Sequence, residues 1–175
     1  MSTMTAEQAA FLLQLELVAQ KSEHGTTKRV IEAIPADKSD YRPDPFSKTA
    51  LELAWHIAAA EHRFLSGIPV GEFDFSPIHR AESVKTPADI ANWFEHSFNE
   101  NIQKLAQMTP EQAAKIIDFR GLIQLPAVAY SRFSLSHTIH HRGQISAYIR
   151  AMGGKIPSIY GESYDSAEAK KAAQA

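Results

Sequence analysis

Apolar residues recur at helical spacing from the start of the chain. They stand three or four positions apart, as one face of an α-helix requires: Phe11, Leu12, Leu15, Val18, Val30, Ile31 and Ile34. The pattern predicts a first long helix from Thr5 to about Ile34, which Pro35 ends. Because Gly25 interrupts the pattern, we expect a bend at that point.

A second helical pattern follows a loop. Residues 35–46 contain three prolines among aspartate, serine and lysine, a composition typical of loops. Ser47 is a suitable N-cap, and helical spacing then continues to about Ser66, before Gly67 and Pro69. We therefore predict a second long helix between Ser47 and Ser66.

The third predicted helix carries a recognisable start signal. Thr86 is a good N-cap, Pro87 suits the first turn, and Asp89 lies near the positive end of the helix dipole. Apolar residues at helical spacing continue to about Met108, where we expect the helix to end.

Shorter segments join these helices. Residues 66–85 have no clear period and form a long connection, which in a compact domain often carries function or wraps over a face. Thr109 begins a short fourth helical piece. Residues 115–119 and 122–125 are two short apolar segments around a turn, and their length does not decide between strand and coil.

The last long helix runs from about Pro126 to Met152, where Gly153 and Gly154 end it. Apolar residues lie on both of its sides, which indicates that one side faces the other helices and the opposite side meets a neighbouring helix or a second subunit. The alanine- and lysine-rich end from Ser166 is predicted to be frayed.

Four long helices with few strand candidates predict an all-α protein, a four-helix bundle with long connections. In such bundles, binding sites are built in the interior from side chains on facing helices. A length of 175 residues with 44% hydrophobic residues fits one domain. We assign residues 1–165 to this single helical domain and residues 166–175 to the frayed C-terminal tail.

Charge, apolar runs and cysteine content limit the kinds of partner and of metal ligand that we expect. The net charge is −2 with acids and bases mixed along the chain, so the sequence indicates no nucleic-acid partner. It has no signal-peptide pattern and no uninterrupted apolar run of ~18 residues, from which we expect no membrane partner and a cytoplasmic location. Because there is no cysteine, a metal ion would be held by nitrogen and oxygen ligands.

Three histidines stand close together in the last predicted helix: His137, His140 and His141. At roughly 100° per residue, His137 and His141 lie about 40° apart around the axis, one turn above the other, so both imidazoles can bind one ion. His140 lies about 60° from His137 on the other side, and it is the alternative to His141 as a ligand.

A metal site needs three or four ligands, so the rest must come from elsewhere in the chain. His56, in the second predicted helix, is the best donor because a bundle places it opposite the histidine pair of the last helix. Glu52, one turn before His56, is a candidate to accept a hydrogen bond from a ligand's second ring nitrogen, as are Ser134 and Gln144.

The other histidines and two arginines are expected outside this site. Four histidines are predicted in loops, at the surface or facing solvent: His24, His62, His79 and His96. Arg142 and Arg150 lie on the far side of the last helix, where we expect them to be solvated or at an interface.

Three neutral imidazoles leave a divalent ion with an open coordination position. Such a site lowers the pKa of bound water towards ~7 or binds a substrate thiolate, so it is catalytic in character. Imidazole suits zinc, nickel and iron alike, so the ligands do not select the metal. A di-iron bundle would need several carboxylates or a Glu-x-x-His repeat, and the sequence has no such repeat.

Three stretches resemble a known family, the DinB-like (DNA-damage-inducible, YfiT-related) metalloenzymes. They are residues 55–61 (Trp-His-Ile-Ala-Ala-Ala-Glu), residues 137–145 (His-Thr-Ile-His-His-Arg-Gly-Gln-Ile) and residues 150–161, which contain Met-Gly-Gly and Ile-Pro-Ser-Ile-Tyr-Gly. The resemblance spans nearly the whole chain. It implies an up-down-down-up four-helix bundle, often a homodimer, in which three histidines matching His56, His137 and His141 hold zinc or nickel.

The resemblance also implies a function. Some members of the family are thiol-dependent transferases or isomerases that use bacillithiol, mycothiol or glutathione, and others are metal-dependent hydrolases. A metal-dependent enzyme acting on a small-molecule substrate, with a low-molecular-weight thiol as partner, is therefore the first hypothesis. The alternative is a non-catalytic stress or assembly protein that binds a metal.

Overall fold

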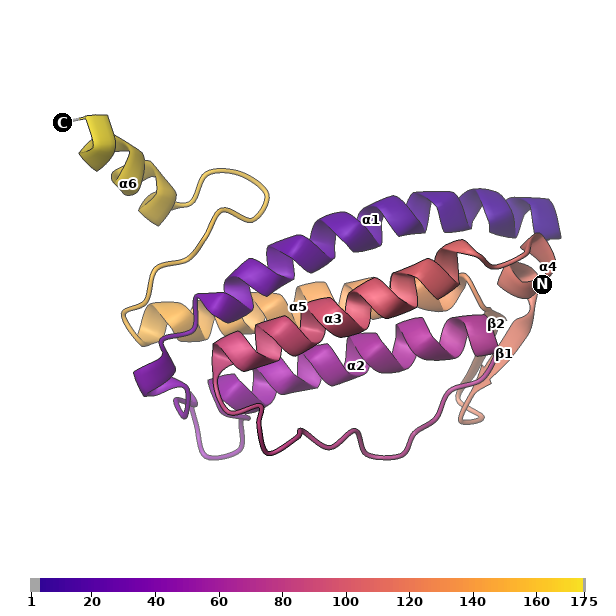
Figure 1. Cartoon of the computed structure of the whole chain (residues 1–175), viewed down its shortest axis with the longest axis horizontal. Helices are drawn as coiled ribbons and strands as arrows, with labels where there is room; N and C mark the ends of the chain where they lie inside the picture. The colour runs from indigo at the N-terminus through magenta and orange to yellow at the C-terminus, as the bar shows by residue number, and fades with distance from the viewer. Residues whose placement is uncertain (1–3, 175) are drawn as a thin grey trace.

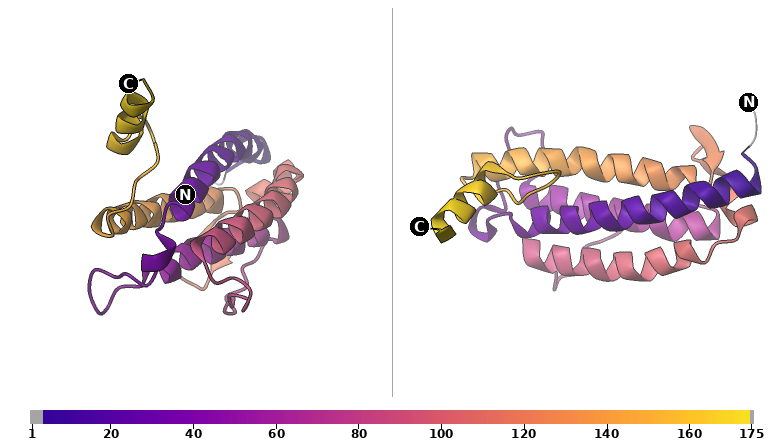
Figure 2. Two further views of the ribbon diagram at one scale, coloured as in Figure 1. Left: turned by 60° about the vertical axis from the view of Figure 1, so that its left-hand side comes forward. Right: turned by 90° about the horizontal axis from the view of Figure 1, so that it is seen from above.

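A computed structural model describes residues 4–174 of the chain. Four long helices lie side by side along its longest axis (Figure 1): α1 (Ala6–Glu32), α2 (Ala50–Val70), α3 (Pro87–Ala106) and α5 (Ala129–Ala151). Helices α1 and α2 each pack against both α3 and α5, so the four enclose a common interior (Figure 2). The fold is thus mostly helical, as the sequence predicts.

Threonine side chains fix where four of the helices begin. Four threonines each accept a hydrogen bond from the backbone N–H three residues on, and the side chain at that position accepts one from the threonine N–H: Thr5, Thr49, Thr86 and Thr109. This reciprocal arrangement satisfies backbone groups that a helix start otherwise leaves unpaired. The prediction of Ser47 as the cap of α2 is wrong by two residues, because Ser47 instead bonds to Asp44 in the preceding loop.

Helix α2 also continues past its predicted end at Ser66. It runs to Val70, and Gly71 in the left-handed conformation (φ 83°) closes it. Gly67 therefore lies inside the helix. The Phe73 ring packs against it, and a Cβ at this position would come within 2.5 Å of that ring. The glycine is a packing residue rather than a helix stop.

A short hairpin stands at one end of the bundle. Strands β1 (Ile116–Phe119) and β2 (Ile123–Pro126) pair antiparallel after the short helix α4 (Pro110–Ala114), which resolves the choice between strand and coil in favour of strand. Pro126 belongs to β2, so α5 begins three residues later than the sequence predicts. The Tyr130 hydroxyl bonds to backbone carbonyls of both strands and joins the hairpin to α5.

The C-terminal segment stands apart from the bundle. Helix α6 (Tyr164–Gln174) follows a loop and projects away from the four long helices (Figure 1). The sequence predicts a frayed end from Ser166, and the structure describes residues 166–174 as part of this helix. None of them is buried, so α6 is a helix without packing support from the bundle.

The interior has two apolar clusters with a polar region between them along the helices. One cluster includes Leu65 and Tyr130, and the other includes Ile57 and Ile145. Buried polar residues lie between these clusters on α1, α2 and α5: Glu16, Gln20, His24, Glu61, Ser131, Ser134 and Thr138. No helix within residues 4–174 is both long and apolar enough to cross a membrane.

His24 belongs to this buried polar region, so its predicted surface position is wrong. Its Nδ1 lies 2.9 Å from a carboxylate oxygen of Glu61 on α2. The ring stacks between Phe94 and Phe98, with centroids 4.1 and 3.8 Å away. Burial raises the pKa of Glu61, and the hydrogen bond with His24 opposes that effect. The sequence pattern misses this pair because the two residues are far apart in sequence and only the packing of the bundle brings their side chains together.

Two more side chains that the sequence predicts near the surface, His62 and Arg142, are buried or partly buried and bind other side chains. His62 is partly buried and shares a hydrogen bond with Ser97, 2.7 Å away, instead of facing solvent. Arg142 is 2% exposed and pairs with Glu23, because the side of α5 that points away from His137 packs against α1.

The exposed Arg150 binds Asp165 at 2.7 Å and ties the C-terminal segment to α5. His79 and His96 are exposed, as predicted.

Candidate metal centre

The structure brings His56 of α2 together with His137 and His141 of α5. One ring nitrogen from each side chain can be chosen so that all three lie within 4.8 Å of one another. The Nε2 atoms of His56 and His137 face each other at 3.1 Å, and the ring centroids of His137 and His141 are 4.3 Å apart. All three side chains are partly buried. Two segments about eighty residues apart in sequence therefore converge on one point.

The local helix geometry explains this convergence. His137 and His141 are one turn apart on α5, so their rings lie on the same stripe of that helix. Helix α2 packs directly against α5, and the cap at Thr49 fixes the start of α2 two turns before His56. The facing-helix arrangement is thus produced by ordinary bundle packing.

Burial keeps two of the three rings neutral. It lowers the pKa of His56 to about 4, and the nearby charges of His141, Lys48 and Arg63 add to the effect. Burial likewise lowers the pKa of His137 to about 4, with His141, His56 and His140 contributing. A neutral imidazole keeps a free lone pair, which is the form that binds a metal ion.

The donor set fits a divalent metal ion. Tetrahedral zinc bonds of about 2.0–2.1 Å separate two nitrogen ligands by about 3.3 Å, close to the 3.1 Å between the Nε2 atoms of His56 and His137. Without an ion, two neutral imidazole nitrogens share a single proton at that contact. The His141 Nδ1 lies 2.6 Å from the Gln144 side-chain oxygen, so it donates there and leaves Nε2 free as a ligand.

The other predicted participants are placed differently. His140 is exposed and lies outside the three-histidine group, with its ring 4.8 Å from that of His141. Glu52 accepts from the Thr49 N–H at 2.8 Å, so it caps α2 rather than orienting a histidine. Gln144 contacts a ring nitrogen as predicted, whereas Ser134 does not: its Oγ and the His137 Nδ1 are both buried without a hydrogen-bond partner among the described residues.

A cleft of about 540 Å³ opens beside His56. Its walls come from α2, from the loop before α2 and from the connection between α2 and α3, which Trp55 holds by donating to the Ile78 carbonyl at 3.2 Å. The sequence predicts that the connection formed by residues 66–85 carries function or wraps over a face of the domain. The contact with Trp55 shows that it covers one face of α2. The basic side chains that line the cleft are not predicted by helical periodicity because they stand mostly in loops.

Two Bacillus subtilis proteins are similar to this chain in sequence. The uncharacterized protein YjoA is 28% identical over 134 residues, which cover 75% of this chain and 85% of YjoA. The uncharacterized protein YrdA is 32% identical over 113 residues, which cover 62% of this chain and 64% of YrdA.

Solved structures share the fold. The DinB-like protein YjoA of Bacillus subtilis has a TM-score of 0.68 at 24% identity, covering 85% of this chain and 99% of that protein. A DinB-like protein from Bacillus cereus has a TM-score of 0.70 at 22% identity, covering 91% of this chain and all of that protein. The sequence model of the DinB family matches residues 1–173. The chain therefore belongs to the DinB family.

Proposed function

We propose that His56, His137 and His141 bind one divalent metal ion, zinc or nickel, and that the protein is a metal-dependent enzyme acting on a small molecule. The observation that carries the proposal is the convergence of three ring nitrogens from α2 and α5 within 4.8 Å of one another. Their partial burial and the lowered pKa of His56 and His137 support it, because neutral imidazoles at neutral pH are ready ligands.

The arrangement also supports catalysis over a purely structural role. A divalent ion with three protein ligands keeps a position for substrate and acts there as a Lewis acid. In this chain, the Gln144 side chain orients the His141 ring, and a cleft open to solvent is lined by His56. Both reaction classes of the first hypothesis, a thiol-dependent transferase or isomerase and a hydrolase, use such a site.

The wider proposal includes the assembly of the protein. The return of residues 71–86 along the bundle supports the up-down-down-up order of the long helices (Figure 1). An apolar stripe on α1, formed by Phe11, Leu15 and Val18 at 52–71% exposure, supports a homodimer. The same stripe favours the second candidate function, a non-catalytic stress or assembly protein that binds metal.

Metal analysis tests the site directly. We expect protein purified without a histidine tag to contain about one divalent ion per chain, and His137→Ala to lose it because two ligands do not hold the ion stably. The matched control is His140→Ala, which changes an exposed neighbour outside the group and should keep the metal. Metal-free wild-type protein, or equal loss in both variants, would contradict the assignment.

Turnover separates the two functions. We expect metal-loaded wild-type protein to transfer a low-molecular-weight thiol to an electrophilic test substrate, or to hydrolyse an ester or amide, and to lose that activity with a chelator. A protein that binds one metal ion per chain and has neither activity in such a screen would support the assembly function instead.

A further inference from the structure

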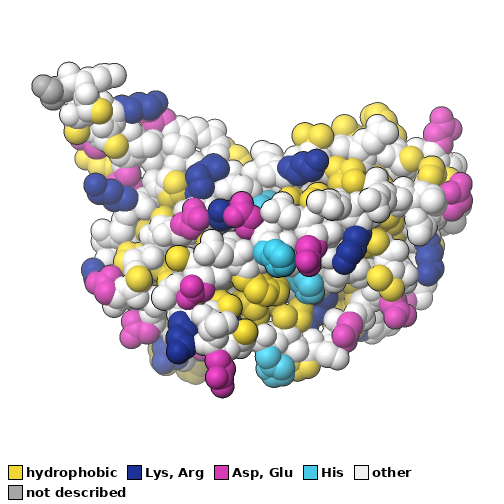
Figure 3. Space-filling model, viewed as in Figure 1, with side chains coloured by type: hydrophobic (Ala, Val, Ile, Leu, Met, Phe, Trp, Pro, Cys, Tyr) yellow, Lys and Arg dark blue, Asp and Glu magenta, His cyan; other side chains and the backbone are white. Residues whose placement is uncertain are grey.

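The cleft beside His56 carries an excess of positive charge. Four basic side chains line it, Arg42, Lys48, Arg63 and Arg80, and a single carboxylate, that of Glu52, does so. The face of the molecule in Figure 3 shows basic and acidic side chains interspersed. The net charge of the chain is −2, so this concentration of one sign is local.

The four cations are not neutralised by carboxylates. Within the described chain, none of them has a carboxylate oxygen within 4.0 Å: the ion pairs formed there involve other lysines and arginines. Arg63 donates to the backbone carbonyls of Asp74 and Ser76, at 2.8 Å each. Arg80 donates to the Val84 carbonyl at 2.9 Å. Backbone carbonyls thus orient the guanidinium groups of Arg63 and Arg80 without neutralising their charge.

The nearby acids are engaged with the backbone. A hydrogen bond from the Thr49 N–H lowers the pKa of Glu52 and holds its carboxylate at the helix cap. Asp44 uses both carboxylate oxygens within its own loop, on the N–H groups of Phe46 and Ser47 and on the Ser47 hydroxyl. Arg42 and Lys48 therefore form no hydrogen bond with these acids. They act on them only by longer-range attraction, which helps to lower the pKa of Glu52 and, for Arg42, that of Asp44.

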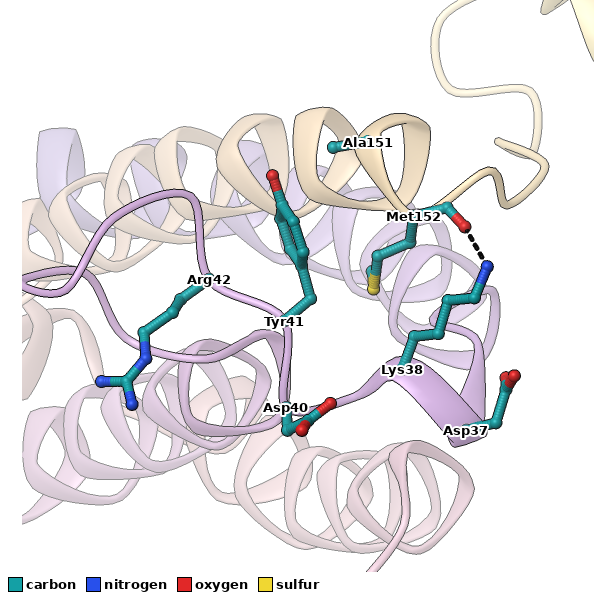
Figure 4. A pocket seen from close by; sticks show the side chains of 7 residues that line it. All are labelled: Asp37, Lys38, Asp40, Tyr41, Arg42, Ala151 and Met152. Carbon is teal, nitrogen blue, oxygen red and sulfur yellow. Dashed lines mark hydrogen bonds between the residues drawn. The ribbon is translucent and has the colours of Figure 1, made fainter.

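Arg42 stands between two clefts. A neighbouring cleft of about 450 Å³, near the end of α5, is lined by Lys38, Tyr41 and Met152 as well as Arg42. Figure 4 shows the Arg42 side chain pointing away from those three residues. In that second cleft, Lys38 donates to the Met152 carbonyl at 2.7 Å. The contrast assigns the free charge of Arg42 to the cleft beside His56.

The wall of the cleft also has an apolar part. Trp55 and Ile78 are held together by the hydrogen bond between the indole N–H and the Ile78 carbonyl. Phe46, which lines the same cleft, is almost fully exposed, at 97%. Exposed aromatic surface next to unpaired cations suits a molecule with an apolar body and an anionic end.

We propose that the cleft beside His56 binds an acidic small molecule, with Arg42 and Lys48 holding its carboxylate or phosphate and Trp55 and Ile78 contacting its apolar part. Unpaired cations in a concave surface focus a positive potential, and guanidinium groups recognise carboxylate and phosphate oxygens directly. The inference rests on the proposed function for one point only, namely that this bound molecule is the substrate at the metal.

Calorimetric titration tests the cleft without relying on catalysis. The probes are 3-phenylpropionate, phenyl phosphate and the neutral 3-phenylpropanol, added to the metal-free full-length chain at about pH 8, above the ordinary pKa of an imidazole. Metal-free protein is used because an anion would also coordinate a metal ion. We expect either anion to bind at least about tenfold more tightly than the alcohol, and to weaken as salt screens the charges.

Charge reversal locates the binding. The double variant Arg42→Glu with Lys48→Glu should lose at least about tenfold in anion affinity, while Lys21→Glu, an exposed lysine of α1 outside the cleft, should bind as wild type does. Circular dichroism checks that each variant is folded. Equal binding of the alcohol, or unchanged affinity in the double variant, would overturn the proposal.

Parallel titrations of wild-type protein with zinc and with nickel keep the two proposals separate. Anion binding in a chain that takes up neither metal would sustain the acidic-ligand cleft and remove the metal centre. Metal binding without selective anion binding would sustain the metal centre and remove the acidic-ligand cleft.

Discussion

At the scale of single residues, histidine type and spacing predict only part of what these side chains do. The i, i+4 spacing of His137 and His141, with His56 on a facing helix, identifies the three histidines that the structure brings together. The same rules place His24 at the surface, although it is buried between two phenylalanine rings. Helical spacing gives the direction of a side chain on its own helix, and its burial depends on which other helix covers that direction.

The lowered pKa of His56 and His137 makes the metal-free protein sensitive to acid. Both groups take up a proton less readily in the folded chain, at a pKa of about 4, than at their ordinary value of 6.5. Their contribution to stability is therefore complete above about pH 6.5 and is lost as the pH falls toward 4, because unfolding then takes up protons.

Urea unfolding in chelator, between about pH 7.5 and pH 4.5, measures this dependence. We expect His137→Gln to reduce the fall in the free energy of unfolding over that range, and His79→Gln, which changes an exposed histidine, to leave it unchanged. A wild-type stability independent of pH over this interval would show that the two rings are not held neutral by burial.

At the scale of elements, the helix starts were predicted unevenly. The sequence predicts Thr86 as an N-cap and Thr5 as the start of the first helix, and the structure places an N-cap at both residues. Before α2, Ser47 and Thr49 are both suitable N-caps, and the loop decides between them, since Asp44 binds Ser47 and leaves Thr49 to bind the Glu52 N–H. Local sequence offers both candidates, and only the path of the preceding loop chooses one.

Replacing the actual cap should therefore matter more than replacing the predicted one. Thr49→Ala is expected to lower the free energy of unfolding by about 1 kcal/mol, because the N–H of Glu52 loses its acceptor. Ser47→Ala removes only a hydrogen bond in an exposed loop and should have a smaller effect. Chemical denaturation compares the two, and equal losses would refute the assignment of Thr49 as the cap that sets α2.

At the scale of the whole molecule, buried apolar contacts stabilise the bundle but not the C-terminal helix. The four long helices share buried apolar clusters, whereas α6 buries none of its residues. An isolated helix this short is marginal in water, so α6 depends on the few contacts at its start, such as Asp165 with Arg150. Residues 168–174 are all exposed, and their ion pairs are surface pairs of little energy.

Ending the chain at Ala167 should consequently leave the bundle intact. We expect the free energy of unfolding to change by less than about 0.5 kcal/mol, because residues 168–174 are all exposed. Thermal unfolding at low and high protein concentration is the measurement. A loss of stability that depends on protein concentration would contradict the expectation and indicate that α6 packs against a second copy.

By itself, the sequence determined the number of long helices, most of their limits and the pair of histidines one turn apart on α5. These features follow from periodicity, caps and backbone geometry, which act over a few neighbouring residues. The tertiary structure decided which helix faces lie together. It set the 3.1 Å approach of the predicted partners His56 and His137. It alone buried His24 with Glu61 and gathered Arg42, Lys48, Arg63 and Arg80 from two loops and a helix around one cleft. Such contacts join distant segments, and no local pattern specifies them because each depends on the packing of the whole bundle.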